Sequence, residues 1–327
     1  MIEPLVSVKM LAYNHAPYIE RAIEGVLCQK TDFPFELVIG EDCSTDGTRE
    51  IVFDYAQRHP DIIRVITSDC NVGMHRNVAR TSAALRGTYI AWCEGDDYWH
   101  RPDKLQVQVD YLEAHPECGL VCSDFDLRDT ASGDTKPSVI LSNPSRYVTD
   151  PDIKDILRGR GGVLTCTAVA RRRLVEDIAA DDPYLHNNGP FLMGDTQLWA
   201  EISLRASIHR IPESLATHNL LSESATRSCD RAKVLRFWLS NSQMCLYLCK
   251  KYDMPLDIQR SHAAIVRRKS LQLAFLENNV DLAGRIRKAY PDMSSKDTLW
   301  YLATRVKAVR PMVRFLLAAA HRHTSNT

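Results

Sequence analysis

The chain has 327 residues, 41 basic and 41 acidic side chains, and 45% hydrophobic residues. This composition is normal for a globular protein, and the length suggests one large domain or two smaller ones. Zero net charge argues against broad nucleic-acid binding. No apolar run approaches the roughly 18 residues that span a bilayer. The start of the chain lacks a basic segment followed by an apolar one, so we expect no signal peptide.

The ten cysteines include no Cys-x-x-Cys pair. Cys118 and Cys122, like Cys245 and Cys249, are four residues apart among apolar neighbours. We expect them to be small buried side chains in a reducing compartment. Pairs with the spacing of zinc ligands are missing, which argues against a zinc site.

Strands and helices alternate from the N-terminus onwards. Period-two and buried apolar runs predict strands at 5–11, 36–40, 62–67 and 89–93, and helical periodicity predicts helices at 18–29, 48–57 and 74–85. We expect Asn14 to cap the first helix, Ser44 or Asp46 to cap the second, and Gly87 to end the third. This alternation predicts an α/β fold with a doubly wound, mostly parallel sheet flanked by helices. Right-handed crossovers would bring the strand ends to one edge.

The strand predicted at 89–93 ends in three carboxylates, those of Glu94, Asp96 and Asp97. Like charges this close repel each other, so a divalent cation would hold them ionised and carry a diphosphate. A solvated acidic turn is the alternative interpretation. The chain lacks both GxGxxG after its first strand and GxxxxGK[ST], so neither a usual dinucleotide fold nor a P-loop is indicated.

The predicted elements become less regular after the acidic stretch. Arg101-Pro102-Asp103 starts a helix, and polar loops are expected at 129–151 and 181–190. The other expected elements are strands at 119–122 and 163–170, a helix at 171–178, a helix ending near Arg205, and extended pieces at 207–211 and 214–217. From Asp230 onwards strands cease and apolar residues recur at helical spacing. We therefore predict an α/β domain over residues 1–225 and an all-helical C-terminal region over residues 226–327.

The last stretch, residues 298–327, contains no acidic residue. Its basic side chains alternate with apolar ones and are Arg305, Lys307, Arg310, Arg314 and Arg322. A basic amphipathic helix of this kind can lie on an anionic membrane surface. A helix packed on the domain, with a solvated basic face, is the alternative. A homo-oligomeric state is also left open.

Five blocks of residues resemble glycosyltransferase family 2, and its bacterial members in particular, in order and spacing. They are Val6-Ser7-Val8 with Tyr13-Asn14; Glu41-Asp42-x-Ser44-Thr45-Asp46-Gly47-Thr48; Asn71-x-Gly73 with Arg76-Asn77; Gly87-x-Tyr89-Ile90; and Glu94-Gly95-Asp96-Asp97-Tyr98-Trp99. Each block alone is a weak signal, but five in register are not expected by chance. The resemblance is strong over residues 5–125 and looser as far as residue 225.

The resemblance implies a GT-A fold, a nucleotide-sugar donor and inversion at the anomeric carbon. Tyr13 would lie against the base, and Asp42 would hydrogen-bond the base edge. The other residues implied to bind the donor are Leu11, Asn71, Arg76, Glu94, Gly95 and Asp96. Asp96 would bind the metal directly, while Glu94 would hold the ribose or an outer-shell water. Oxygen ligands suit Mg²⁺ or Mn²⁺, which would neutralise the departing nucleoside diphosphate.

Met193-Gly194-Asp195 resembles the family's block whose aspartate is the general base. Inversion needs a carboxylate that takes the acceptor hydroxyl's proton during attack opposite the leaving group. Asp195 also starts a predicted helix, so an N-terminal cap is the alternative role. Trp199, one turn further on, is expected in the core or in the acceptor wall.

Three positions depart from the family's pattern. Glu94 replaces the usual first aspartate, Cys43 stands where glycine is common, and Thr217-His218 stands where Tyr-Arg is frequent. His218 is a candidate metal ligand or diphosphate contact, and a surface histidine is the alternative. No Gln-x-x-Arg-Trp block and no spanning helices follow, which disfavours a processive polymer synthase.

These features predict an inverting, metal-dependent glycosyltransferase. It would move a sugar from a nucleotide-sugar, expected to be a UDP-sugar, to a hydroxyl of a glycan or lipid-linked acceptor in surface polysaccharide synthesis. We expect it in the cytoplasm, with peripheral contact at the inner face of the cell membrane. A nucleotide-sugar-forming nucleotidyltransferase is one alternative, although the loop at 13–18 lacks the Gly-rich, basic character it usually needs. A non-catalytic nucleotide-sugar binder is another, against which the intact Asp42, Asp96 and Asp195 argue.

Overall fold

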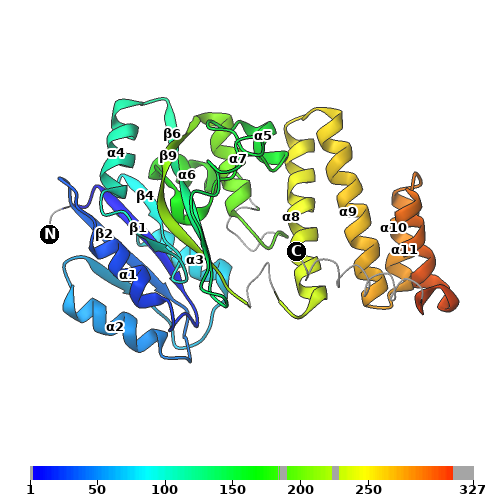
Figure 1. Ribbon diagram of the computed structural model, residues 1–327, viewed down its shortest axis with the longest axis horizontal. Coiled ribbons are helices and arrows are strands. Elements are labelled where there is room, and N and C mark those ends of the chain that lie inside the picture. The colour runs from blue at the N-terminus through cyan, green and yellow to red at the C-terminus, as the bar shows by residue number, and fades with distance from the viewer. Residues whose placement is uncertain (1–2, 183, 185–189, 223–227, 312–327) are drawn as a thin grey trace. The chain divides into compact units, whose positions relative to one another are not determined.

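The structure, a computed structural model, describes residues 3–182, 184, 190–222 and 228–311. The chain divides into two compact units (Figure 1). Unit 1 comprises residues 1–190 and 194–221, and unit 2 comprises residues 191–193 and 222–327. Strands occur in unit 1, and the regular elements described in unit 2 are helical.

Unit 1 alternates strands and helices along its first half, as the sequence predicts. The elements there are β1 (Val6–Ala12), α1 (Ile19–Leu27), β2 (Phe35–Glu41), α2 (Thr48–Arg58), β3 (Ile63–Ile66), α3 (Met74–Ala83), β4 (Tyr89–Trp92), β5 (Tyr98–Trp99) and α4 (Lys104–Ala114). The second half contains β6 (Cys118–Asp129), β7 (Thr135–Lys136), α5 (Ile153–Leu157), η1 (Thr165–Thr167), β8 (Val169–Arg171), α6 (Arg172–Asp181), α7 (Asp195–Arg205) and β9 (Ser207–Leu220).

These strands form one sheet in the order β3-β2-β1-β4-β8-β6-β9-β5, with β7 paired to β6. β1 pairs in parallel with β2 and β4. β8 is antiparallel to both β4 and β6, and β9 is parallel to β6. The carboxyl ends of β1, β2, β4, β6 and β9 therefore meet at one edge, which we call the rim. The predicted α/β class is confirmed, and the antiparallel pairings are features that the sequence did not indicate.

β1 lies between two parallel neighbours and is buried along almost its whole length. Val6, Val8 and Met10 are fully buried in the core between the sheet and its helices. Gly87 does not end α3 as expected, because that helix ends at Ala83. Gly87 instead lies against β1, where a Cβ atom would come within 2.4 Å of the Ser7 backbone nitrogen.

The turn after β1 also differs from its expected role. Asn14 does not cap α1, since Tyr18 occupies the cap position and no side chain bonds the first turn. Asn14 has a φ of 57°, and its side-chain oxygen accepts the backbone N–H of Thr45 at 2.9 Å. The turn is thus joined to the loop before α2, where Asp46 accepts the backbone N–H of Thr48.

The second half of the sheet is more continuous than the sequence suggested. The extended pieces expected at 207–211 and 214–217 are parts of the single strand β9. The strand expected at 163–170 is instead the short helix η1 followed by the three-residue strand β8. β6 extends to Asp129, and the polar loop expected after it contains the two-residue strand β7.

Unit 2 is built from α8 (Arg231–Lys251), α9 (Leu256–Leu276), α10 (Val280–Ala289), α11 (Ser295–Arg305) and the short helix η2 (Lys307–Val309). Its buried acid, Asp297, closes a capping box with Ser294 at the start of α11. Arg267 and Arg268 from α9 form ion pairs with the same carboxylate. These contacts join α9 to the start of α11.

The basic segment expected over residues 298–327 is described only in part. Its first residues lie in α11 and η2, and residues 312–327 fall outside the described part of the chain. Within the residues that the structure describes, none of the helices combines the length and apolarity needed to cross a bilayer.

Candidate functional site at the rim

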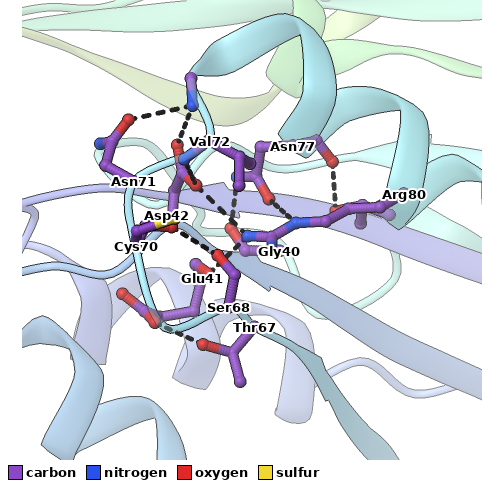
Figure 2. A network of polar contacts seen from close by, with 12 residues as sticks. Gly40, Glu41, Asp42, Thr67, Ser68, Cys70, Asn71, Val72, Asn77 and Arg80 are labelled. Atoms are coloured by element: carbon purple, nitrogen blue, oxygen red, sulfur yellow. Dashed lines mark hydrogen bonds and ion pairs between the residues drawn. The ribbon is translucent and has the colours of Figure 1, made fainter.

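The end of β2 carries Asp42, whose buried carboxylate organises the loop before α3 (Figure 2). Its two oxygens accept the backbone N–H groups of Val72 and Gly73 at 2.9 and 3.0 Å. Asn71 accepts from the same Gly73 nitrogen through its side-chain oxygen at 2.9 Å. Asp42, at the end of β2, and Asn71, on the loop before α3, are both predicted to bind the donor and are therefore brought together.

Arg80 closes the other side of this network (Figure 2). Its guanidinium donates to the backbone oxygen of Glu41 at 2.8 Å and lies 3.4 Å from an oxygen of Asp42. Asn77, also on α3, donates to the backbone oxygen of Gly40 and accepts from Arg80. The end of β2 and the helix α3 are thus fixed to each other by polar contacts made within the protein.

The remaining predicted base-side residues surround this network. Tyr13, just beyond β1, keeps 45% of its surface exposed, which suits a ring on which a base can stack. Leu11 is half-buried and pairs with Gly40 across the sheet. Arg76 lies on the exposed side of α3, one turn before Arg80.

The acidic loop after β4 runs very close to the end of β1. The Gly95 nitrogen donates to the Leu11 oxygen at 3.0 Å. A Cβ atom at Gly95 would come within 2.8 Å of the His15 Nδ1 atom and 3.1 Å of the Leu11 oxygen. Glycine is therefore required in Glu94-Gly95-Asp96 by the close approach of the chain, with His15 packed against it.

Burial and mutual repulsion govern the charges of this loop. Burial, and then the nearby charges of Asp97 and Asp96, raise the pKa of Glu94 to about 8, although a backbone hydrogen bond and the charge of Lys9 partly oppose them. Burial and Asp97 also raise the pKa of Asp96, while the charges of His15 and then His218 lower it. One Glu94 oxygen, Oε2, is buried without a hydrogen-bond partner. Ionised together, these acids would therefore carry more negative charge than the protein itself compensates.

Asp97, the third acid, faces β9 instead. Its oxygens lie 2.9 and 3.0 Å from His218 Nδ1, and one of them accepts the Asn219 backbone N–H at 2.9 Å. The Asn219 side chain donates to the Asp96 backbone oxygen at 2.6 Å. Although burial lowers the pKa of His218, the charge of Asp97 and its hydrogen bond outweigh this effect and raise it. His218 is thus a partly exposed rim residue whose ring is held by Asp97.

Asp195 is the first residue of α7, and Gly194 occupies the cap position. Its carboxylate accepts the backbone N–H of Thr196 at 2.7 Å. Neighbouring atoms desolvate the carboxylate and raise its pKa, although the residue keeps solvent-accessible surface. One turn on, Trp199 packs edge-on against Trp92 at the end of β4, with ring centroids 5.3 Å apart. This contact brings the start of α7 to the part of the rim where the acidic loop begins.

A metal ion would need ligands beyond these side chains. Among the described residues, no group of three or more His, Cys, Asp or Glu side chains is arranged to hold an ion. Asp96 offers carboxylate oxygens, and His218 on β9 offers a ring nitrogen held beside the same loop by Asp97. The donor set fits a cation such as Mg²⁺ or Mn²⁺ that takes its other ligands from substrate phosphates and water.

Sequence reasoning missed Arg80, Asn219 and the separate role of Asp97. Arg80 follows Arg76 by four residues, so both lie on one side of α3, and helical spacing could have indicated it. Asn219 adjoins His218, but nothing in the sequence pairs it with Asp96. Asp97 differs from its neighbouring acids only through its contacts with β9.

Solved structures share this fold. Residues 1–349 of TarS from S. aureus, in complex with UDP-GlcNAc, align with 93% of this chain and 88% of that chain at 17% identity and a TM-score of 0.61. The mannosyltransferase PcManGT from Pyrobaculum calidifontis, in complex with GDP-Man and Mn²⁺, aligns with 95% of this chain and 87% of its own at 16% identity and a TM-score of 0.57. The predicted GT-A fold is confirmed, and it is the fold of a glycosyltransferase class.

The sequence matches the family described as Glycosyl transferase family 2 over residues 7–178, more than half of the chain. The chain belongs to this family. TuaG of Bacillus subtilis (strain 168), a proposed teichuronic acid biosynthesis glycosyltransferase, is 33% identical over 159 residues, covering 48% of this chain. An uncharacterized protein of Mycobacterium tuberculosis (strain ATCC 25618 / H37Rv) is 39% identical over 186 residues, covering 55% of this chain. The matches span 60% and 52% of these relatives, so the chain covers little more than half of their length.

Proposed function

We propose that the chain is an inverting glycosyltransferase that transfers a sugar from a nucleotide-sugar, a UDP-sugar by preference, to a hydroxyl of a glycan or lipid-linked acceptor. Family membership and the fold support a transferase in polysaccharide synthesis. The donor class is supported by fold neighbours solved with UDP-GlcNAc and with GDP-Man. In this proposal Tyr13, Asp42 and Asn71 bind the nucleoside, and the acidic loop faces the diphosphate.

One observation carries the proposal: the pairing of His218 with Asp97 beside Asp96. The Asp97 carboxylate lies 2.9 Å from Nδ1 of the His218 ring. The other ring nitrogen, Nε2, is therefore the one available to a ligand. A histidine that binds a metal almost always donates its other ring N–H to a carboxylate or carbonyl, which fixes its orientation. A solvated acidic turn would need no such orientation.

Asp96 and His218 would hold the cation in this scheme. When bound, Mg²⁺ or Mn²⁺ would offset charge on the nucleoside diphosphate as it leaves. Glu94 would contact the ribose or a water of the outer shell. The contribution of these residues is to orient the diphosphate at the rim.

Asp195 is the proposed general base. Its carboxylate accepts the proton of the acceptor hydroxyl while the hydroxyl oxygen forms a bond to the anomeric carbon. The bond from that carbon to the diphosphate oxygen breaks on the opposite face, which inverts the configuration. The raised pKa of Asp195 strengthens it as a proton acceptor near neutral pH. One oxygen of the same carboxylate, Oδ1, accepts the Thr196 N–H at the start of α7, so Oδ2 is the oxygen that we propose takes the proton.

The acceptor is proposed only as a class of molecule, a glycan or a lipid-linked sugar. The names of relatives such as TuaG favour a cell-surface polysaccharide. The basic stretch from residue 298 onwards would rest on anionic lipid at the cytoplasmic face of the membrane. A lipid-linked acceptor would then be met at the membrane surface.

A transfer assay tests the function directly. The protein is incubated with radiolabelled UDP-, GDP- or dTDP-sugars, Mn²⁺ and lipid-linked acceptors, and labelled product is counted. We expect transfer from a UDP-sugar by the wild type and its loss in Asp195→Asn. No transfer by the wild type from any of these donors, or undiminished transfer by Asp195→Asn, would remove the proposal.

The metal assignment has its own test. A thermal-shift screen with the same nucleotide-sugars and Mn²⁺ reports binding, because a bound ligand stabilises the folded state by mass action. We expect a UDP-sugar to raise the melting temperature and EDTA to abolish the shift. A shift that survives EDTA would show that Asp96 and His218 do not act through a cation.

A further inference from the structure

His15 is a second imidazole beside the acidic loop, and no role has been assigned to it. It belongs to the turn at Asn14–Ala16 between β1 and α1. Its ring packs in the space that Gly95 leaves, and its Nδ1 atom would be 2.8 Å from a Cβ atom there. The residue therefore lies directly against the backbone of Glu94-Gly95-Asp96.

The turn that carries His15 is held firmly in place. Each of its three backbone N–H groups donates to a side chain of the loop before α2 or of the first residue of α2: Asn14 to Ser44 at 3.1 Å, Ala16 to Asp46 at 2.9 Å, and His15 to Thr48 at 2.7 Å. A side chain on so constrained a turn has a fixed origin, which is what an oriented ligand contact requires.

Two polar atoms near His15 lack protein partners. The Nδ1 atom of His15 and the Oε2 atom of Glu94 are both buried without a hydrogen bond. Buried polar atoms are nearly always bonded, so an orphan in a candidate site indicates a missing ligand or ordered water. Since Nδ1 is enclosed while the residue is only half-buried, the exposed part of the ring includes Nε2.

The electrostatics indicate what kind of ligand would approach. His15 lies against Gly95, the residue before Asp96, and His218 approaches the same loop from β9 through its contact with Asp97. An ionised carboxylate at this loop repels a diphosphate, so donors placed next to the loop help to decide whether an anion can bind. An imidazole N–H is a suitable donor to a phosphate oxygen.

We propose that His15 contacts the diphosphate of the donor and the departing nucleoside diphosphate, donating a hydrogen bond from its imidazole to a phosphate oxygen. This inference rests on the proposed function. It adds a donor from the β1–α1 turn to the proposed cation ligands, which are Asp96 on the acidic loop and His218 on β9. The contact is to phosphate and not to the base, since Asp42 and the 71–73 loop lie with β2 and α3.

The test compares a ligand with and without phosphates. Binding of UDP and of uridine is measured by calorimetry for the wild type, His15→Ala and His15→Gln, in EDTA and again with Mn²⁺. We expect His15→Ala to weaken UDP binding about tenfold in both conditions, the effect of one charge-assisted hydrogen bond, and to leave uridine binding unchanged. His15→Gln keeps an N–H donor, so its loss should be smaller.

Controls separate this inference from the broader proposal. His115→Ala removes an exposed imidazole at the end of α4 and should leave UDP binding unchanged. Melting temperatures of the free variants show whether the turn still folds, and His15→Gln serves if His15→Ala does not. Equal UDP affinity in the wild type and both His15 variants, equal losses for UDP and uridine, or a loss confined to Mn²⁺ would overturn the phosphate contact. A wild type that binds no nucleoside diphosphate would instead defeat the proposed function.

Discussion

The two sides of the rim differ in how completely their polar groups are paired within the protein. On the β2 side, the Asp42 carboxylate, the 71–73 loop and Arg80 satisfy one another within the protein. On the β4 side, Glu94 retains an orphan oxygen and His15 an orphan nitrogen. The polar groups on the β2 side are therefore paired before any ligand binds, whereas those on the β4 side leave unpaired atoms that a bound ligand could pair with. Substitutions on the first should cost folding stability, and substitutions on the second should cost binding or turnover.

The largest expected effect lies at Asp195. Asp195→Asn keeps the shape of the side chain but removes the proton acceptor, so we expect transfer to fall by about 10²–10⁴-fold. Donor binding, followed as a thermal shift with a UDP-sugar, should persist because the donor side is untouched. A control in the same helix is Glu201→Gln, which alters an acid paired with Arg205. A comparable loss of transfer in that control would show that α7 had merely been disturbed.

The next effect tests the imidazole beside Asp96. Asp97→Asn removes the negative charge and replaces one acceptor oxygen by an NH2 group, so His218 Nδ1 and the Asn219 N–H must share one neutral acceptor and the ring is held less firmly. We expect affinity for Mn²⁺, titrated in the presence of UDP, to fall about 10–100-fold. Binding of uridine alone should not change. If Mn²⁺ affinity is the same in the variant, the Asp97–His218 pair is structural and the two sides of the rim differ less than we infer.

The sequence predicted the first side of the rim well, for a physical reason. Asp42 and Asn71 follow predicted elements closely, and parallel strands bring their ends together whatever the details of packing. The acidic loop was found in the same way, because Glu94 comes directly after a buried strand. Family resemblance added the choice of residues within each block.

The rest depended on contacts that local sequence does not encode. β9 was expected as two pieces, separated by Pro212 and Glu213. In the sheet, Ile211 pairs with Ser123 and Ser214 with Asp124. Pro212 and Glu213 therefore form an irregularity within one strand. That strand brings Asn219 and His218 to Asp97, more than 120 residues away in sequence. The contact between Arg80 and Asp42 likewise depends on the position of the Arg80 side chain in the fold. The family pattern had indicated Arg76, and not Arg80, as a donor-binding residue.

On the β2 side we expect a smaller effect, which is a loss in the free energy of unfolding. Asp42→Asn exchanges one acceptor oxygen for an NH2 group; when this group faces Val72, the Val72 N–H loses its acceptor, whereas the Gly73 N–H would keep Asn71. Leaving one such buried group unpaired costs about 1–3 kcal/mol. Urea unfolding of the free protein measures it, with the surface variant Asp103→Asn as a control expected to lose no more than about 1 kcal/mol. A loss no larger than the control's would mean that ligand, and not the fold, organises the 71–73 loop.

The smallest effect concerns the support beneath the acidic side. Lys104 is fully buried, donates to Gln108 at 2.6 Å, and lies over the ring of Trp99, just after the acidic loop. Burial lowers its pKa to about 7, although nearby thiols partly oppose the shift. Between this value and the ordinary 10.5, the unfolded chain binds a proton that the folded chain does not, so this group makes stability rise with pH across that window.

Lys104→Met isolates that contribution, because methionine fills a similar volume and does not titrate. The variant should be more stable than the wild type below pH 7, and its advantage should shrink as the pH rises towards 10.5, by up to about 1.4 kcal/mol per pH unit. Urea unfolding at several pH values gives the difference between the two proteins, in which the other titrating groups cancel. A difference that does not vary with pH would mean that Lys104 stays charged in the fold. If Lys104→Met is more stable than the wild type and binds UDP equally well, the buried amine is not needed for UDP binding. If Lys104→Met binds UDP more weakly, Lys104 helps to position Trp99 and the neighbouring acidic loop for the ligand.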